Sequence, residues 1–206
     1  ANRAIEHGLR RIDKRRGFRR PTRNIISGGQ SLEGFRDERW SRPLAVGDIV
    51  PAVVVAIGRP APSGAARLKV GAYSADLGRD GFVWTRRTSA ADLFTVGDLI
   101  EVEITAVNHD THVLTVTLEQ TPTVEGALIA IENRTGHIKA MVGGWSFTRS
   151  KFNRAVQALR QMGSTFKPVV YTTAIDRGFT ASTIIVDEPT SYDPGPNQPP
   201  YVPQNY

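Results

Sequence analysis

The 206-residue sequence contains no cysteine, which excludes disulfide bonds, thiolate metal sites and cysteine nucleophiles. No stretch approaches the roughly 18 apolar residues that cross a bilayer, and the N-terminus lacks the apolar segment of a secretory signal. We expect that any membrane anchor lies outside this sequence. The composition, with 40% hydrophobic and 22% charged residues, is typical of a globular chain of one or two domains.

Acidic residues are scarce at the N-terminus. Residues 1–24 hold nine Arg or Lys against two acidic residues, whereas the rest of the chain is nearly neutral. Such a basic arm suits anionic lipid, nucleic acid or a neighbouring domain, and a solvated helix face is the alternative. If lipid or a glycan-synthesising domain is the partner, Arg10, Arg11, Arg15 and Arg16 are the expected contacts.

Residues 1–43 are interpreted as a basic helix and a linker. Residues 2–16 place apolar or small residues on one helical face, and Gly17 is expected to end this helix. Residues 19–43 show no period and are punctuated by proline and glycine, which indicates a linker.

Residues 44–121 alternate apolar and polar side chains in short runs that turn residues separate. This pattern predicts a small closed barrel of the OB type, with a core large enough to fold alone and separate from its flanks. The sequence Val-Gly-Asp, at 46–48 and at 96–98, leads into a long strand each time and is interpreted as one turn used twice. The predicted strands are 48–57, 66–70, 73–77, 81–85, 98–107 and 112–118, and a turn-rich loop is expected at 58–64.

Residues 122–206 change character again. Two apolar strands at 127–132 and 137–142, joined by Asn-Arg-Thr-Gly, predict a hairpin. Helical spacing follows at 151–178. The tail from Pro189 is rich in proline and has no core pattern, and we expect the sequence to stop inside a longer domain.

The candidate catalytic residues are Ser164 and Lys167, which follow Gly163. Residues three apart share a helix face, so the amine is expected to reach the hydroxyl. A serine needs a base because its protonated hydroxyl is a poor nucleophile. A lysine acts as a base only when neutral, which requires burial or nearby cations to lower its pKa from about 10.4. By itself the four-residue pattern Ser-x-x-Lys is weak evidence, because about 0.27 matches are expected by chance. A helix N-cap serine followed by a surface lysine gives the same pattern.

The surrounding sequence strengthens this signal. Residues 152–155 (FNRA) and 160–168 (RQMGSTFKP) resemble the segment around the active serine of penicillin-binding transpeptidases. Residues 125–144 resemble the hairpin that opens that domain, and residues 8–21 resemble the linker that leaves the glycosyltransferase domain of class A members. With its OB-like insert, the sequence resembles a class A penicillin-binding protein of the 1a type. It departs at Met162, where the family usually has proline, and this is expected to change the approach to the helix.

The resemblance implies a mixed fold: an all-β OB-type barrel at 44–121, then the N-terminal part of an α/β, β-lactamase-like transpeptidase domain at 122–206. It implies a peptidoglycan synthase at the periplasmic face of the inner membrane, which polymerises glycan and cross-links stem peptides through acylation of Ser164 while Lys167 takes its proton. The implied partners are D-Ala-D-Ala stem peptides on lipid II-derived glycan, β-lactams as covalent inhibitors, an envelope protein at the OB-like domain, and the membrane. No cofactor is implied, and no nucleic acid is expected.

Two motifs of that family are missing from the sequence. They are S-x-N, which supplies a proton relay, and K-T-G, which supplies a carboxylate-binding strand and an oxyanion donor. The glutamates of the glycosyltransferase are missing too. We therefore expect the sequence by itself to be catalytically inactive.

A non-enzymatic module, an S1-like OB barrel acting on RNA or a protein partner, is the alternative. Tyr73, Phe82 and Trp84 would stack on bases in such a module. Residues 44–121 carry six basic and nine acidic residues, however, which disfavours phosphate binding, so core packing of these aromatics is expected.

Loops at 58–66 and 86–95 favour docking of a protein instead. His109 and His112 lie beside Asp110 in a turn with no third ligand suggested, so no metal site is predicted.

Overall fold

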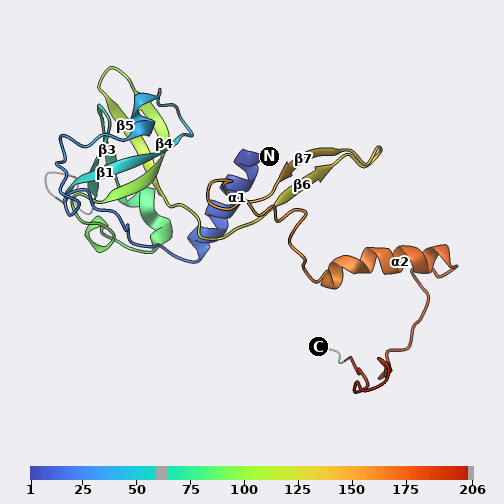
Figure 1. Cartoon of the computed structure of the whole chain (residues 1–206). Helices are drawn as coiled ribbons and strands as arrows, with labels where there is room; N and C mark the ends of the chain where they lie inside the picture. The colour runs from blue at the N-terminus through green and yellow to red at the C-terminus, as the bar shows by residue number, and fades with distance from the viewer. Residues whose placement is uncertain (59–64, 204–206) are drawn as a thin grey trace. The chain divides into compact units, whose positions relative to one another are not determined.

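A computed structural model of the chain describes residues 1–58 and 65–203 and divides into two units, residues 1–158 and residues 159–206 (Figure 1). The loop expected at 58–64 and the last residues of the sequence fall largely outside the described residues. The elements of the first unit are α1 (Asn2–Arg15), η1 (Glu38–Ser41), β1 (Ile49–Ile57), β2 (Ala66–Val70), β3 (Tyr73–Leu77), η2 (Arg79–Thr85), η3 (Ala90–Asp92), β4 (Leu99–Asn108), β5 (Val113–Glu119), β6 (Leu128–Ile131) and β7 (Ile138–Val142). The second unit contains η4 (Gly163–Phe166) and α2 (Lys167–Asp176).

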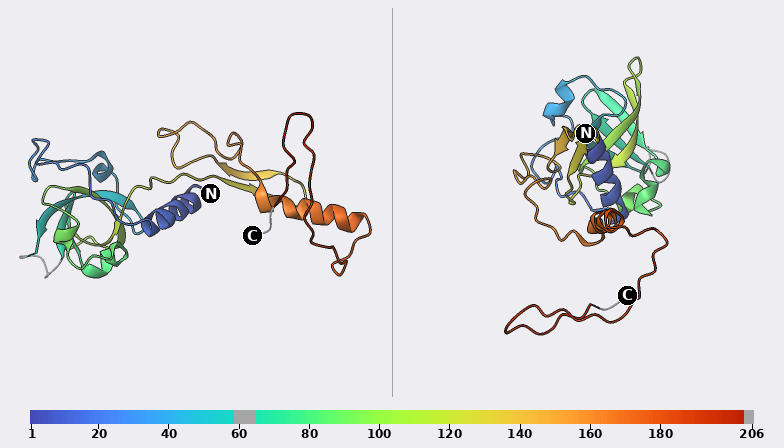
Figure 2. Two further views of the ribbon diagram at one scale, coloured as in Figure 1. Left: turned by 90° about the horizontal axis from the view of Figure 1, so that it is seen from below. Right: turned by 90° about the vertical axis from the view of Figure 1, so that its right-hand side faces the viewer.

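Strands β1 to β5 close into a barrel, which the left view of Figure 2 shows as a ring. Their order around the barrel is β1-β2-β3-β5-β4. All pairs are antiparallel except β3 and β5, which run parallel. This strand pairing confirms the predicted closed barrel. The alternating apolar residues of β4 and β5 point into its core. The buried core includes Val50, Val54, Leu68, Val70, Leu77, Ile100, Val102, Ile104, Leu114, Val116 and Leu118.

The two Val-Gly-Asp turns are built alike, which confirms the interpretation of one turn used twice. In each turn the aspartate carboxylate accepts a hydrogen bond from the backbone N–H three residues earlier, Ala45 for Asp48 and Thr95 for Asp98. Both glycines have a positive φ, 87° at Gly47 and 92° at Gly97, a conformation that glycine adopts without strain. Their N–H groups donate to β4 and β1 respectively, so each turn fixes the start of one strand against the other.

The strand predicted at 81–85 is wrong, because these residues belong to η2. Gly81 N–H donates to the Gly78 carbonyl and starts a tight helical turn. A side chain at Gly81 would lie 2.7 Å from Leu77 Cδ1 and 3.1 Å from the Val116 carbonyl oxygen, so the backbone packs directly on the barrel. Of the consecutive apolar residues 82–84 in this segment, Phe82 lies in the core whereas Val83 is 65% exposed.

The segment interpreted as a linker packs on the barrel, so the barrel is not separate from its N-terminal flank. Ile25 is 1% exposed and Phe35 is 4% exposed, and both contact Val53 in a second apolar cluster. Backbone hydrogen bonds join Ile25 N–H to Gly97 O and Leu99 N–H to Arg23 O. Proline and glycine break the periodicity of such a segment without preventing its apolar side chains from being buried.

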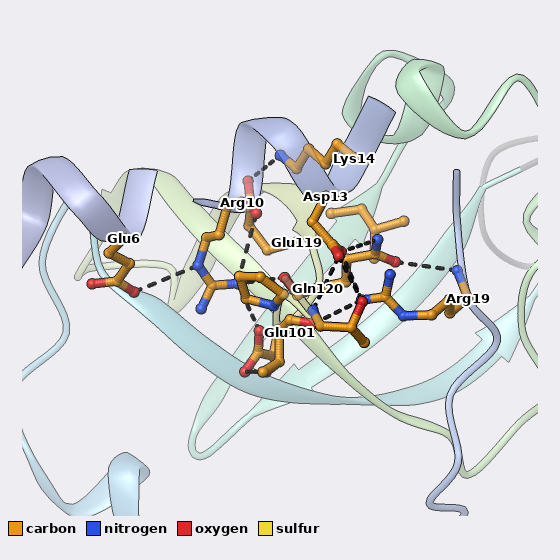
Figure 3. A network of polar contacts seen from close by, with 12 residues as sticks. Glu6, Arg10, Asp13, Lys14, Arg19, Glu101, Glu119 and Gln120 are labelled. Carbon is orange, nitrogen blue, oxygen red and sulfur yellow. Dashed lines mark hydrogen bonds and ion pairs between the residues drawn. The ribbon is translucent and has the colours of Figure 1, made fainter. Parts of the chain in front are cut away.

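Helix α1 confirms the predicted N-terminal helix and ends at Arg15, two residues before Gly17. It is attached to the barrel by polar contacts between residues more than 90 positions apart in the chain (Figure 3). Arg10 is only 6% exposed, and its Nη1 donates to Glu101 Oε2 at 2.8 Å and to the Gln120 carbonyl at 2.9 Å. Lys14 pairs with Glu119, which is buried on β5. The expectation that Arg10 contacts lipid or a neighbouring domain is therefore wrong, because its guanidinium is buried and bonded to groups of the barrel.

Strands β6 and β7 form the predicted hairpin, in which Gly136 takes a positive φ of 72° in the turn. The helix predicted at 151–178 begins only at residue 163. Between these elements, the side chains of Ser150 and Asn153 accept hydrogen bonds from backbone N–H groups two residues later, which competes with helix formation. Among the described residues, no helix has the length and apolar character needed to cross a membrane.

Candidate active site

Ser164 lies in the 3-10 turn η4 that leads directly into α2. The backbone N–H of Lys167 donates to the Ser164 carbonyl, so one turn separates the two residues. Side chains three apart eclipse each other in a 3-10 turn, which places the serine hydroxyl and the lysine amine on the same side of the chain. Gly163 opens the turn with a positive φ of 52°, and a Cβ there would meet nothing within 4 Å.

Both candidate residues are exposed to solvent. Within the described residues, no hydrogen bond or ion pair joins the Ser164 and Lys167 side chains, and each is free of side-chain partners. Among the described residues of the second unit, a backbone turn thus places the two groups on one side of the chain, and no side chain covers them.

Met162 has φ −69° and ψ −32°, which are angles that a proline also adopts. The expected change in the approach to the helix is therefore absent at this residue, since the backbone has the angle that proline would impose.

The segment that precedes this turn is held by a carboxylate that sequence reasoning missed. Glu125 Oε2 accepts from the backbone N–H of Trp145 at 2.9 Å, and Glu125 Oε1 lies 3.1 Å from Arg149 Nε. Arg154 adds a longer ion pair of 3.5 Å, while its backbone N–H donates to Gly143 O. The one indication in the sequence that Glu125 holds this segment is its position just before the hairpin.

Gly143 is required where it stands, because a Cβ there would lie 2.5 Å from Asn153 Oδ1 and 2.8 Å from Asn153 Cα. The backbone at Gly143 therefore packs directly against Asn153, which leaves no room for a side chain at residue 143.

The aromatic residues considered for base stacking separate into two groups. Phe82 is fully buried in the barrel, and Trp84 packs against the core with its Nε1 donating to Leu118 O, so both serve packing as expected. Tyr73 is half-buried: its ring also packs against the core, as expected, and its hydroxyl lies 2.9 Å from His109 Nδ1. Across the described residues, no three His, Cys, Asp or Glu side chains are grouped as metal ligands.

Comparison with known proteins places this geometry in a family. Residues 126–204 match the family described as penicillin binding protein transpeptidase domain. Penicillin-binding protein 1A of Rickettsia felis is 33% identical over 208 residues, which cover all of this chain and 25% of the relative. Penicillin-binding protein 1A of Neisseria gonorrhoeae is 49% identical over 87 residues, which cover 42% of this chain and 11% of that protein.

A solved structure is similar over almost the whole chain. The crystal structure of penicillin-binding protein 1A from Haemophilus influenzae superposes with a TM-score of 0.68 at 28% identity, covering 99% of this chain and 29% of that one. The chain spans about a quarter or less of the length of these two curated relatives. By its transpeptidase-domain match and its similarity along the whole sequence, the chain belongs to the class A penicillin-binding proteins of the 1A type.

Proposed function

We propose that this chain is part of a peptidoglycan synthase that cross-links stem peptides, with Ser164 as the acylated nucleophile and Lys167 as its base. The observation that carries the proposal is the turn η4, which aligns the two side chains inside the segment that matches the transpeptidase family. The whole protein would also polymerise glycan at the periplasmic face of the inner membrane, where β-lactams would inhibit it covalently.

The proposed reaction has two steps. Lys167, as the neutral amine, takes the proton of Ser164 Oγ while that oxygen attacks the carbonyl carbon of the penultimate D-Ala. The tetrahedral intermediate collapses, the bond to the terminal D-Ala breaks, and Lys167 returns the proton to the departing amine. An amine of a second stem peptide then attacks the ester carbonyl, the bond to Ser164 Oγ breaks, and Lys167 passes the proton of the amine to that oxygen, which forms the new amide and releases Ser164.

Further parts of the transpeptidase domain would complete this site. The apolar residues of helix α2 are distributed around its circumference and are exposed, with Val170 52%, Tyr171 63% and Ile175 64% exposed. A helix that is apolar on all sides is normally buried. Covering α2 would also desolvate Lys167, which favours the neutral amine that a base requires.

We also propose that the barrel is of the OB type, as its strand order and its parallel β3–β5 pair support. An envelope protein is the proposed partner of this barrel. RNA binding receives no support from Phe82 and Trp84, since both are used in packing.

The function is tested by replacing Lys167 in the full-length protein. Lys167→Ala should slow acylation by a penicillin by about 10²–10⁴-fold, the usual effect of losing a general base. Lys167→Arg should not restore the rate, because arginine stays protonated at any working pH. Lys151→Ala is the matched control, since Lys151 is an exposed lysine upstream of the turn. An acylation rate that is unchanged by Lys167→Ala would refute the role of this lysine.

A further inference from the structure

One face of helix α1 carries cationic groups that the barrel does not use. His7, Arg11 and Arg15 are exposed and follow one another at intervals of four residues, so their side chains lie in a row along the helix. Within the described residues, none of these three side chains takes part in a hydrogen bond or an ion pair. We call them the α1 row (His7, Arg11 and Arg15), and the row is available to a group outside the chain.

The α1 row lines an open cleft of about 600 Å³ between the helix and the barrel. The barrel side of the cleft contains Ile49, from the start of β1, and Glu103, its partner on β4. Gly8 also lines the cleft, and a Cβ there would meet nothing within 4 Å, so the helix backbone is open to the cleft at this residue. A cleft of this size holds a small molecule.

The barrel side of this cleft carries one carboxylate that the protein does not neutralise. Glu119 lines the cleft too, but it is buried and pairs with Lys14 (Figure 3). Arg10, which also lines the cleft, is buried and pairs with Glu101 at 2.8 Å. Glu103 is half-buried, and its side chain has no hydrogen bond or ion pair among the residues that the structure describes. The groups left to meet a ligand are therefore the α1 row on one side and Glu103 on the other.

Opposite charges on the two sides of the cleft favour a ligand that carries both signs. Among the described ion pairs, none joins Glu103 to Arg11 or Arg15, so a bound molecule has to span the cleft to contact both sides. Guanidinium groups match the oxygens of a phosphate, and a carboxylate accepts hydrogen bonds from an ammonium group. A simple anion or a chain of phosphates would satisfy the α1 row but would be repelled by Glu103.

We propose that this cleft binds phosphoethanolamine, a phosphate ester with an ammonium group, either as a soluble molecule or as the headgroup of a lipid. The phosphate lies against the α1 row and the ammonium group lies against Glu103. This assignment narrows the expected lipid contacts to Arg11 and Arg15, because Arg16 does not line the cleft. All the residues of the cleft belong to the first unit, so the proposal does not depend on the chemistry at Ser164.

The first experiment titrates the chain of residues 1–206 with phosphoethanolamine and with glycerol phosphate, which has the phosphate but no ammonium group, and follows the backbone amide signals by NMR. We expect saturable shifts at Gly8 and Glu103 with phosphoethanolamine. Arg11→Gln should weaken this binding about fivefold, the usual effect of one basic residue near phosphate headgroups. Glu103→Gln should weaken phosphoethanolamine by a similar factor without weakening glycerol phosphate, because the carboxylate attracts the ammonium group and repels the phosphate.

The matched controls replace the same residue types outside the cleft. Arg16→Gln removes an exposed arginine beside the α1 row, and Glu33→Gln removes an exposed glutamate. Both should leave the affinity for phosphoethanolamine unchanged. Arg11 and Glu103 have no partner among the described side chains, so their substitutions should leave the unfolding midpoint unchanged and weaker binding would not reflect misfolding.

The second experiment sediments the chain with phosphatidylcholine vesicles that contain or lack phosphatidylethanolamine. Binding that requires phosphatidylethanolamine and is weakened by Arg11→Gln and Glu103→Gln identifies a lipid headgroup, whereas binding of the soluble ester alone identifies a soluble ligand. Binding in neither experiment would overturn the proposal. So would an equal loss for Arg16→Gln and Arg11→Gln, or an equal effect of Glu103→Gln on the two soluble ligands. Tighter, salt-dependent binding of oligouridylate that Glu103→Gln does not weaken would overturn it as well.

Discussion

Asp13 shows how a single residue organises the place where the chain enters and leaves the barrel (Figure 3). Its carboxylate is 0% exposed and accepts hydrogen bonds from Arg19 Nη2 at 2.7 Å, Gln120 Nε2 at 2.7 Å and Thr123 N–H at 3.0 Å. Burial raises the pKa of Asp13, but the hydrogen bonds from Arg19, Thr123 and Gln120 outweigh it, so that the pKa lies below its ordinary value. These partners tie α1 to the segment after β5.

The first prediction concerns this carboxylate. Asp13→Asn should destabilise the chain by about 2–4 kcal/mol at pH 7, because an amide N–H₂ would face groups that are all donors. Since the native pKa is lowered, the stabilisation from Asp13 is fully present above about pH 4 and is lost as the pH falls through the lower native value. Urea unfolding at pH 7 and below pH 4 should therefore show a smaller acid loss for Asp13→Asn than for the unaltered chain. Asp110→Asn, at an exposed aspartate, is the control, and equal effects of the two substitutions would contradict the role of Asp13.

No local pattern in the sequence could predict the role of Asp13, since two of its partners lie more than 100 residues away in the chain. The candidate pair of Ser164 and Lys167 was different, because its residues are three apart and stand in a recognisable frame. A candidate pair could thus be named from the sequence where its residues are close along the chain, and the catalytic role of Ser164 and Lys167 stays a prediction.

At the scale of elements, strands were predicted well because alternation reports directly which face of a strand is buried. Strands β2 and β3 have the predicted bounds, β1 begins one residue later than predicted, and β4 and β5 are each shifted by one residue at both ends. The prediction failed at 81–85 and at 151–162. In the first segment Phe82 and Trp84 pack on the barrel from a 3-10 turn. In the second segment the side chains of Ser150 and Asn153 accept the hydrogen bonds of backbone N–H groups in place of helical carbonyls.

The second prediction tests whether the segment before the barrel belongs to its core. Ile25→Ala should destabilise the barrel by about 2–5 kcal/mol, because Ile25 is 1% exposed and its truncation leaves a cavity beside Val53. Ile26→Ala is a matched control at the next residue, where the side chain is 47% exposed, and it should cost less than about 1 kcal/mol. Thermal unfolding of both variants makes the comparison. If Ile25→Ala were as stable as Ile26→Ala, residues 19–43 would be a linker after all.

At the scale of the whole molecule, the two units differ in how completely they bury their apolar residues. The barrel and its flanks bury a continuous core, whereas Leu159 is 97% exposed and Ile184 is 91% exposed in the second unit. Exposed apolar residues on this scale mark a surface that another part of a protein covers. The chain spans about a quarter or less of the length of these curated relatives. We propose that further parts of the full-length protein cover this surface and complete the site at Ser164.

The most direct test is mass spectrometry of the intact full-length protein after reaction with a penicillin, followed by mapping of the modified peptide. We predict one adduct, on Ser164, that is lost in Ser164→Ala and kept in Ser182→Ala, a substitution at another exposed serine of the same unit. Ser164→Ala removes a single exposed hydroxyl, so its unfolding should be unchanged and the loss of the adduct would not reflect misfolding. An adduct on a different serine, or one that Ser164→Ala retains, would contradict the assignment of Ser164 as the nucleophile.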